Sequence, residues 1–395
     1  MFEHAVAQRM NSLAGESAFQ ILAAANRLEA RGEKVIHFEI GEPDFPTAHH
    51  IKEAARAALD DGHTRYCSSQ GLLSLREAIA EYARTYKKVP ARPEQVVVAP
   101  GGKPVIFCTI SALVNPGDEV ICPNPGFPTY ESVIRYVGGI PVPIALEEKS
   151  GFRFSTEALK ERISPRTKLI ILNSPSNPTG GILSAHDLTE IAAAIESRDI
   201  FVLSDEIYSR IVFGGSAPSI ATIPVMRDKT IVLDGFSKTY CMTGWRLGYG
   251  IMHEELAEKV TRLLINSISC TTHFVQDAGI AALKGPQDSV DAMVAEFARR
   301  RDIIVDGLNA IRGITCRKPE GAFYAFPNVT GTGLTSGELA RVLLEEAGVA
   351  VLDGAAFGKF GTGYLRLSYA TSTDLIRQGL ERIDATVKRR GRWER

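Results

Sequence analysis

Short runs of aliphatic and β-branched residues alternate with longer segments of helical periodicity through the middle of the chain. This alternation constrains the possible fold more than any other feature. Residues 105–114 and 183–197 are two of the segments with helical spacing. Strands that alternate with helices predict β-α-β units, and so a mostly parallel sheet covered by helices on both faces. The predicted strands are residues 96–99, 119–122, 168–173, 200–204 and 230–233.

The pattern changes near Lys284-Gly285-Pro286. Residues 287–311 then form one long, strongly charged helical segment, and short strands and helices follow to the C-terminus. The first 35 or so residues also look helical, and the turn-rich stretch 41–46 follows them. A chain of 395 residues is long enough for two or three domains. We expect an α/β protein with a large domain over residues 48–285 and a smaller α/β domain built from residues 1–47 and 286–395.

The charge balance and the apolar segments exclude some classes of protein. The 45 basic and 46 acidic side chains leave a formal net charge of −1, which provides no overall field to hold nucleic acid or an anionic membrane. The longest apolar runs, such as 169–172 and 200–203, are far too short to span a bilayer. The starting residues Met-Phe-Glu-His do not resemble a secretory signal. We expect a soluble, cytoplasmic protein.

No spacing of cysteines or histidines predicts a metal site. The six cysteines are scattered and form no C-x-x-C pair, so we expect reduced thiols. His49-His50 is better explained as the start of a helix. The chain also lacks a G-x-x-x-x-G-K-[ST] loop and a G-x-G-x-x-G turn after a strand, so neither a P-loop nor a dinucleotide site is supported.

Polar and ionisable residues follow four of the predicted strands. In an open parallel sheet, ligands bind outside the carboxyl ends of the strands. Each segment alone has an ordinary explanation, as a helix cap, a turn or a surface lysine. Together they indicate one shared crevice. The segments are Pro100-Gly101-Gly102-Lys103, Asn173 to Gly180, Ser204-Asp205-Glu206-Ile207-Tyr208, and Asp234 to Lys238 followed by Thr243 to Gly248.

These segments resemble those of the aminotransferases among the fold type I pyridoxal-phosphate enzymes, and the similarity covers nearly the whole chain. The most specific piece is residues 237–249, SKTYCMTGWRLGY, which resembles the family's cofactor-lysine segment. The segment Pro100-Gly101-Gly102-Lys103 resembles the bacterial aspartate aminotransferase branch. Further matching pieces are Gly41 to Phe45, Tyr66 with Gly71 and Leu75-Arg76, Asn177 to Gly180, Asp205 to Tyr208, and Tyr364 to Ser368.

The resemblance implies roles for the residues around the cofactor ring. Lys238 would form the Schiff base with pyridoxal phosphate, and Asp205 would keep the pyridine nitrogen protonated. Asn177 and Tyr208 would hydrogen-bond the ring hydroxyl oxygen, and Phe127 would stack on the ring. From sequence alone, a core phenylalanine is nearly as good an interpretation of Phe127. The implied catalytic residues are Lys238, Asp205 and Tyr208.

The resemblance also implies a phosphate site. Gly102 and Lys103 open a helix whose N–H groups attract an anion, Arg246 can bind phosphate through two hydrogen bonds, and Ser237 offers a hydroxyl. The chain departs from the family at Gly235, where many relatives have a phosphate-binding serine. In relatives, the tyrosine that Tyr66 matches reaches the partner's cofactor phosphate, which implies a homodimer with shared active sites.

The substrates implied are amino acids and 2-oxo acids. Arg366 would bind the α-carboxylate, with Asn177 and the backbone N–H of Gly41 beside it. Lys103 would bind the second carboxylate of aspartate, which favours aspartate with 2-oxoglutarate; alternatively, only its backbone would matter, at the phosphate. Aromatic amino acids, alanine, prephenate and specialised substrates remain open.

Two other classes of function and one structural expectation also stay open. The fold could serve a pyridoxal-phosphate lyase, such as a carbon–sulfur lyase, or a non-enzymatic regulator. Two features argue against a regulator. The residues Lys238, Asp205 and Arg246 are intact, and the chain has no added basic DNA-binding module. We further expect cis peptide bonds at Asn177-Pro178 and Asn124-Pro125.

Overall fold

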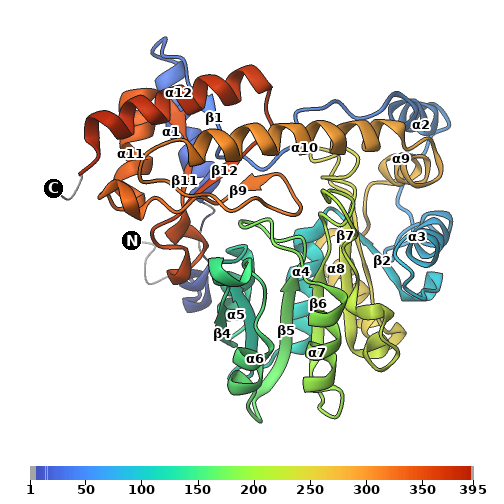
Figure 1. Cartoon of the computed structure of the whole chain (residues 1–395). Coiled ribbons are helices and arrows are strands. Elements are labelled where there is room, and N and C mark those ends of the chain that lie inside the picture. Colours follow the sequence, from blue (N-terminus) through green and yellow to red (C-terminus); the bar gives the residue numbers. More distant parts are fainter. Residues whose placement is uncertain (1–5, 14, 16, 393–395) are drawn as a thin grey trace.

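A seven-stranded sheet forms the centre of the computed structural model, which describes residues 6–13, 15 and 17–392. The starting residues Met-Phe-Glu-His lie outside the described part. The strand order is β2-β8-β7-β6-β5-β3-β4 (Figure 1). Its strands are β2 (Val96–Ala99), β3 (Glu119–Asn124), β4 (Ile140–Ala145), β5 (Thr167–Asn173), β6 (Phe201–Asp205), β7 (Thr230–Gly235) and β8 (Gly248–Ile251).

The expected mostly parallel sheet is confirmed. Strands β3 to β7 pair in parallel, and only β8 pairs antiparallel, with both β2 and β7. All five predicted strands are present, and most extend further than predicted. Strands β4 and β8 were missed, because their sequences IPVPIA and GYGI contain residues that are rare inside strands. The prolines of β4 are tolerated because β4 lies at the edge of the sheet.

Helices cover both faces of this sheet, and alternate strand residues pack on opposite layers. Leu203 and Leu233 pack against α4 (Gly102–Leu113), α5 (Thr129–Tyr136) and α8 (Glu254–Ile268). Val202 faces the opposite layer with α7 (Ala185–Ile195), and Val232 faces it with α3 (Leu73–Thr85). The other helices of this layer are α2 (His49–Asp60), α6 (Thr156–Arg162) and α9 (His273–Lys284).

Two small sheets are built from the N-terminal and C-terminal parts of the chain. Strand β1 (Ile36–His37) pairs in parallel with β10 (Val349–Ala350). Strands β11 (Leu352–Asp353), β12 (Leu365–Ser368) and β9 (Tyr324–Ala325) form a second, antiparallel sheet. In Figure 1, α10 runs across the top of the central sheet from α9 toward α12. The helices here are α1 (Ser17–Glu29), α10 (Asp288–Asn309), α11 (Ser336–Ala347) and α12 (Thr373–Arg390).

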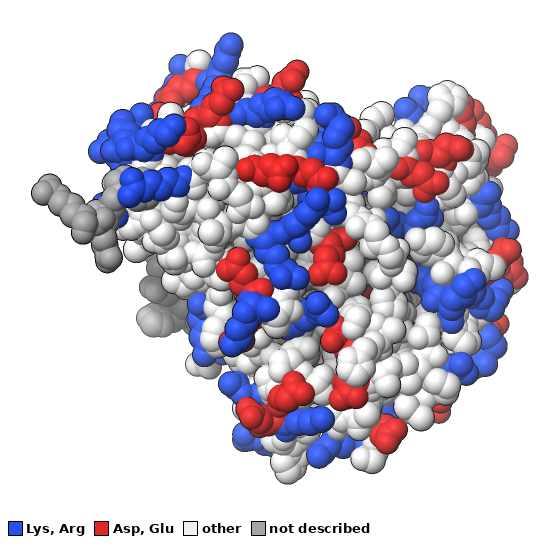
Figure 2. Space-filling model, in the orientation of Figure 1, with Lys and Arg blue, Asp and Glu red and all other residues white. Residues whose placement is uncertain are grey.

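The peptide bonds before proline, the helix lengths and the surface charges can also be compared with the predictions. Both expected cis peptide bonds are confirmed, at Asn124-Pro125 and Asn177-Pro178, and Ser174-Pro175 is cis as well. Within the described residues, no helix combines the length and apolar character needed to cross a membrane. The molecular face in Figure 2 carries acidic and basic side chains that are interspersed.

Candidate active site

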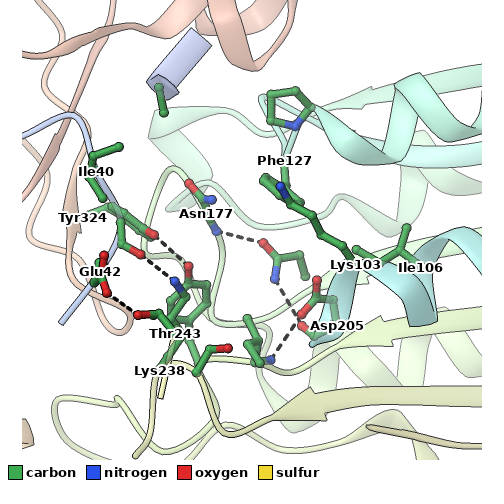
Figure 3. A pocket seen from close by; sticks show the side chains of 18 of the residues that line it. Ile40, Glu42, Lys103, Ile106, Phe127, Asn177, Asp205, Lys238, Thr243 and Tyr324 are labelled. Atoms are coloured by element: carbon green, nitrogen blue, oxygen red, sulfur yellow. Dashed lines mark hydrogen bonds between the residues drawn. The ribbon is translucent and has the colours of Figure 1, made fainter. Parts of the chain in front are cut away.

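A cavity of about 600 Å³ opens at the carboxyl ends of β5, β6 and β7. It brings together every predicted site residue except Tyr66. In Figure 3, Lys103 and Phe127 lie on one side of the cavity, and Tyr324, Glu42 and Lys238 lie on the other. The predicted residues that line it are Gly41, Gly102, Lys103, Phe127, Asn177, Asp205, Tyr208, Ser237, Lys238, Arg246 and Arg366.

Asp205 is the last residue of β6, and its carboxylate is buried inside this cavity wall. The Tyr130 hydroxyl donates a 2.6 Å hydrogen bond to Oδ2, and the Ile207 N–H donates a 3.2 Å bond to Oδ1. Burial raises the pKa of Asp205 to about 6, although both hydrogen bonds oppose this rise. The site therefore holds a carboxylate that is ionised at neutral pH and has little water around it.

Asn173 and Asn177 connect the end of β5 to Asp205. The Asn173 side-chain amide donates to the Asp205 carbonyl over 3.1 Å, and its oxygen accepts the Asn177 N–H over 2.8 Å. The side-chain oxygen of Asn177 is buried and has no hydrogen-bond partner among the described residues. Buried polar groups are rarely left unpaired, so this amide is placed for a ligand.

Lys238 follows β7, and its Nζ donates a 2.5 Å hydrogen bond to the Gly41 carbonyl. Burial is the largest cause that lowers the pKa of Lys238, to about 8, and nearby Arg366 and Arg246 act in the same direction. The amine is consequently much more often neutral at physiological pH than a surface lysine. A neutral amine is what nucleophilic and proton-transfer chemistry requires.

Tyr208 lies beside Tyr324, with 2.7 Å between the two hydroxyl oxygens. Burial raises the pKa of Tyr208 well above its ordinary value, so the phenol stays protonated. Gly41 packs closely against Tyr324, because a Cβ at position 41 would overlap the Tyr324 hydroxyl. Close packing against Tyr324 is thus a second reason for glycine here, besides the predicted approach of substrate.

The predicted phosphate end is formed where β2 leads into α4. Gly101 has φ +96°, and a Cβ there would overlap the Arg246 guanidinium. Arg246 donates to the carbonyls of Thr243 (2.8 Å) and Pro100 (3.3 Å), which fixes its position beside the start of α4. The departure at Gly235 also has a structural reason: a Cβ there would lie 3.0 Å from the Gly248 Cα.

Two further cations line the cavity. Arg366 on β12 is 3% exposed and donates to the Glu39 carbonyl. Its guanidinium lies over the Tyr324 ring, 4.6 Å from the centroid. The Lys103 Nζ lies 5.9 Å from the centroid of the Phe19 ring and 5.7 Å from that of Phe127. Both cations, Arg366 and Lys103, therefore lie close to aromatic rings.

Tyr66 does not line the cavity, and it is 86% exposed. The sequence analysis missed a second cluster, in which His63, His273 and Asp277 have potential metal-ligand atoms within 4.8 Å of one another. His63 Nδ1 already hydrogen-bonds Asp277 Oδ2 (2.8 Å). The two imidazoles stack at 4.4 Å with an angle of 8°. Their lone pairs lie in the ring planes and do not converge, so this cluster is explained without an ion.

Sequence reasoning missed the residues that hold the predicted ones in position. Tyr130 lies in α5 and Tyr324 in β9, and nothing in their local sequence distinguishes them from core tyrosines. Their functional contacts are to residues 75 and 116 positions away. Asn173 was a detectable signal, because it is a polar residue at the end of a buried strand.

The site fits pyridoxal phosphate, which the resemblance implies. The fit rests on a low-pKa lysine amine, a buried carboxylate and an unsatisfied amide on Asn177. The N-terminus of α4 and the Arg246 guanidinium supply the positive region that a phosphate needs. No carboxylate among the described residues is hydrogen-bonded to Arg246, so its charge is available there.

Comparisons with known proteins agree with this geometry. Residues 33–383 match the family model described as aminotransferase class I and II. The chain is 42% identical to a probable aspartate/prephenate aminotransferase of Aquifex aeolicus over 391 residues, 97% of this chain and 98% of the relative. It is 39% identical to an aromatic-amino-acid aminotransferase of Thermococcus litoralis over 360 residues, 90% of this chain and 92% of the relative.

The fold comparison gives the same result. The structure of an aspartate aminotransferase from Thermus thermophilus with maleate has a TM-score of 0.92 and 34% identity, covering 96% of this chain and 99% of that one. Family members depend on pyridoxal phosphate. The chain therefore belongs to the class I and II aminotransferase family and is a pyridoxal-phosphate-dependent aminotransferase.

Proposed function

We propose that this aminotransferase acts on aspartate and transfers its amino group to a 2-oxo acid such as 2-oxoglutarate. The observation that carries the proposal is that two cations, Arg366 and Lys103, line the same cavity as Lys238. A dicarboxylic amino acid needs one cation for each carboxylate. The names of several relatives refer to aspartate, and maleate, in the related Thermus structure, is also a four-carbon dicarboxylate.

The residues of the cavity divide into those that hold the cofactor and those that hold the substrate. Gly102, the backbone of Lys103, Ser237 and Arg246 bind the phosphate, and Phe127 covers the ring. Asn177 and Tyr208 hydrogen-bond the ring hydroxyl oxygen, while Asp205 pairs with the ring nitrogen. Arg366 binds the substrate α-carboxylate, assisted by Asn177 and the Gly41 N–H, and the Lys103 ammonium binds the distal carboxylate.

Proton transfer is the work of Lys238. When bound, pyridoxal phosphate holds the substrate nitrogen and delocalises the electrons that the departing α-proton leaves behind. The Lys238 Nζ would accept that proton from the α-carbon and, within the same half-reaction, would pass it to the C4′ carbon of the cofactor. The second half-reaction would run this transfer in reverse. A pKa of about 8 permits both directions near neutral pH. Asp205 keeps its negative charge opposite the ring nitrogen, because Tyr130 and the Ile207 N–H stabilise the ionised form.

A half-reaction screen tests this proposal. The holoenzyme is mixed with each amino acid in turn, without an oxo acid, and the visible absorbance of the cofactor is followed. We expect the largest kcat/KM with aspartate or glutamate. A maximum with phenylalanine or tyrosine would overturn the aspartate proposal and favour an aromatic substrate. Release of ammonia with pyruvate, instead of conversion of the cofactor to its amine form, would identify a lyase.

A Lys103 variant tests the role of the distal cation. Lys103→Met retains most of the apolar stem and removes the charge. We expect it to lower kcat/KM for aspartate by about 10- to 100-fold, as for the loss of one charge-assisted contact of roughly 1.5–3 kcal/mol. The value for alanine, which has no distal carboxylate, should change little. An equal loss for both amino acids would instead indicate that Lys103 acts at the phosphate.

We also propose the assembly, the domain division and the location that the resemblance implies. Residues 48–285 form the cofactor-binding domain, and residues 1–47 with 286–395 form the small domain. The chain acts as a cytoplasmic homodimer, in which Tyr66 of each protomer reaches the cofactor phosphate of the other. The exposure of Tyr66, 86%, supports a contact outside its own protomer.

A further inference from the structure

A buried ion network lies directly behind Asp205. The Lys87 Nζ lies 2.8 Å from Glu206 Oε2 and 2.6 Å from Asp234 Oδ2, and each of the three side chains is only 4% exposed. Lys87 follows the end of α3, whereas Glu206 follows β6 and Asp234 belongs to β7. One cation thus connects the ends of the two strands that carry Asp205 and lead to Lys238.

The network and the cavity occupy opposite faces of the sheet. Side chains alternate along a strand, so Asp205 shares a face with Leu203, while Glu206 and Asp234 point to the layer that contains α3. The carboxylates of Glu206 and Asp234 also accept hydrogen bonds from other groups. The hydroxyls of Ser204 (2.9 Å) and Ser219 (2.6 Å) donate to Glu206 Oε1, and the Gly235 N–H donates to Asp234 Oδ1 over 2.7 Å.

The other titratable groups around the network do not supply the positive charge that Lys87 provides to the two carboxylates. Tyr82 from α3, Tyr249 from β8 and Tyr240, which follows Lys238, have pKa values raised by burial and remain neutral. Arg210 stacks on Tyr86 and binds Asp291 (3.2 Å). With both carboxylates ionised, the network carries a net charge of −1 when Lys87 is present and −2 when it is absent.

We propose that Lys87 is a positioning residue for the cofactor, which keeps Asp205 ionised opposite the pyridine nitrogen by offsetting the two carboxylates behind it. The proposal rests on the proposed role of Asp205. Glu206 and Asp234 both disfavour the ionised form of Asp205, so removal of Lys87 strengthens their effect. A proton shared between Asp205 and the ring nitrogen then shifts toward Asp205, and the ring loses the positive charge that stabilises the transition state.

The test measures the ring nitrogen itself. The holoenzyme is prepared with pyridoxal phosphate labelled with ¹⁵N in the ring, and the ¹⁵N chemical shift reports whether that nitrogen is protonated. In Lys87→Met we expect the shift to move toward that of unprotonated pyridine, with kcat lower by on the order of tenfold, which is the effect of about one pKa unit. Lys88→Met, a change at the neighbouring exposed lysine, should leave both unchanged.

A charge-matched variant separates electrostatics from packing. Lys87→Met/Asp234→Asn restores the network charge to −1, so we expect the ¹⁵N shift and kcat to return most of the way to the wild-type values. If Lys87 serves only the packing of buried side chains, the melting temperature falls in both variants while the ¹⁵N shift stays at the wild-type position. That result would overturn the proposal.

Two further variants keep the test decisive. If Lys87→Met alone does not fold, the double variant is compared with Asp234→Asn, in which the network charge is 0. The proposal requires the ring nitrogen to be more completely protonated in Asp234→Asn than in the double variant. Equal ¹⁵N shifts in the two variants would refute it. Asp205→Asn tests the role on which the inference rests. An unchanged ¹⁵N shift in Asp205→Asn would reject that role, whereas a change there but none in Lys87→Met would reject the Lys87 proposal alone.

Discussion

Tyr130 donates a 2.6 Å hydrogen bond to the Asp205 carboxylate from α5, on the layer of helices next to the cavity. Tyr130 is itself almost fully buried and its ring packs edge-on against Phe127 at 5.6 Å. One tyrosine therefore contacts both the carboxylate proposed to pair with the cofactor and the aromatic ring proposed to cover it.

Removal of this hydroxyl should change the pH dependence of the enzyme. The hydrogen bond stabilises the ionised form of Asp205 and opposes the rise of its pKa to about 6. In Tyr130→Phe we expect that pKa to rise further, so that the acidic limb of kcat/KM moves to higher pH by about one unit, equivalent to about 1.4 kcal/mol. Tyr136→Phe, on the same helix, is the control. An acidic limb that does not move would show that Tyr130 does not influence Asp205 in the working enzyme.

Lys238→Ala should abolish amino transfer while the fold remains. Among the described residues that line the cavity, Lys103 is the only other lysine that could provide an amine. The far-ultraviolet circular dichroism spectrum and the melting temperature provide the check on folding. Substantial transamination by the folded variant, without an added amine, would contradict the assignment of Lys238.

The depressed pKa of Lys238 also predicts a stability change in the cofactor-free protein. Its pKa falls from 10.5 to about 8 because burial disfavours the ammonium form. Below pH 8 the folded state must carry that buried charge; above pH 10.5 the amine is neutral in both states. The destabilisation, at most about 3 kcal/mol, therefore disappears as the pH rises from 8 to 10.5.

Lys238→Met tests the direction of this change in stability, because methionine keeps the apolar part of the side chain and has no group that titrates. The cofactor-free variant should be more stable than the cofactor-free wild type at pH 7.5, and the difference should shrink toward pH 10.5. Thermal unfolding of the two proteins across this range measures it. A difference that is constant with pH would mean that Lys238 does not titrate in this window.

A pair of glycines isolates the contact between Gly101 and Arg246. Gly101 (φ +96°) and Gly117 (φ +91°) both have a positive φ, so an alanine is under backbone strain at either position. Only at Gly101 does the added Cβ overlap the Arg246 guanidinium; at Gly117 nothing lies within 4 Å. Gly101→Ala should thus weaken pyridoxal-phosphate binding by about tenfold or more, as for one lost charge-assisted hydrogen bond.

The same variant should leave the binding of pyridoxal, which lacks the phosphate, nearly unchanged, and Gly117→Ala should affect neither ligand. Equilibrium titration of the cofactor-free proteins with both compounds makes the comparison. Equal weakening for pyridoxal and pyridoxal phosphate would place the damage at the ring and not at the phosphate end.

The sequence was most informative where local pattern and fold agree. Buried runs such as β2 and β5 are continuous, so their period and length identify them as strands. Polar residues at their carboxyl ends then follow from the geometry of a parallel sheet. Glycine-rich β8 lacks both signals, because its stability comes from pairing with β2 and β7 on either side.

The supporting residues of the site could not be predicted in the same way. Lys87 and Glu206 are separated by 119 positions, and in the sequence Lys87 stands beside Lys88 as an ordinary charged pair. Only the fold reveals that one of these lysines is buried between two carboxylates. Contacts of this kind depend on how α3 packs against the ends of β6 and β7, which no local pattern specifies.

Tyr66 provides the test of a composite active site. A tyrosine that is 86% exposed and lies outside the cavity of its own protomer has an apolar ring with no partner surface in the described chain that could bury it. Tyr66→Phe removes only the hydroxyl. We expect weaker binding of pyridoxal phosphate in the homodimeric variant, and no change in the binding of pyridoxal.

Mixed dimers of Lys238→Ala and Tyr66→Phe chains then determine which protomer Tyr66 serves. If Tyr66 acts across the interface, one site of each mixed dimer combines an intact Lys238 from the Tyr66→Phe chain with an intact Tyr66 from the other chain. Activity per chain that carries Lys238 should then exceed that of the Tyr66→Phe homodimer when the cofactor is limiting. If Tyr66 serves its own protomer, no mixed site contains both residues and no gain appears. Because both arrangements contain the same chains in the same ratio, a flat result from verified mixed dimers would exclude the shared site.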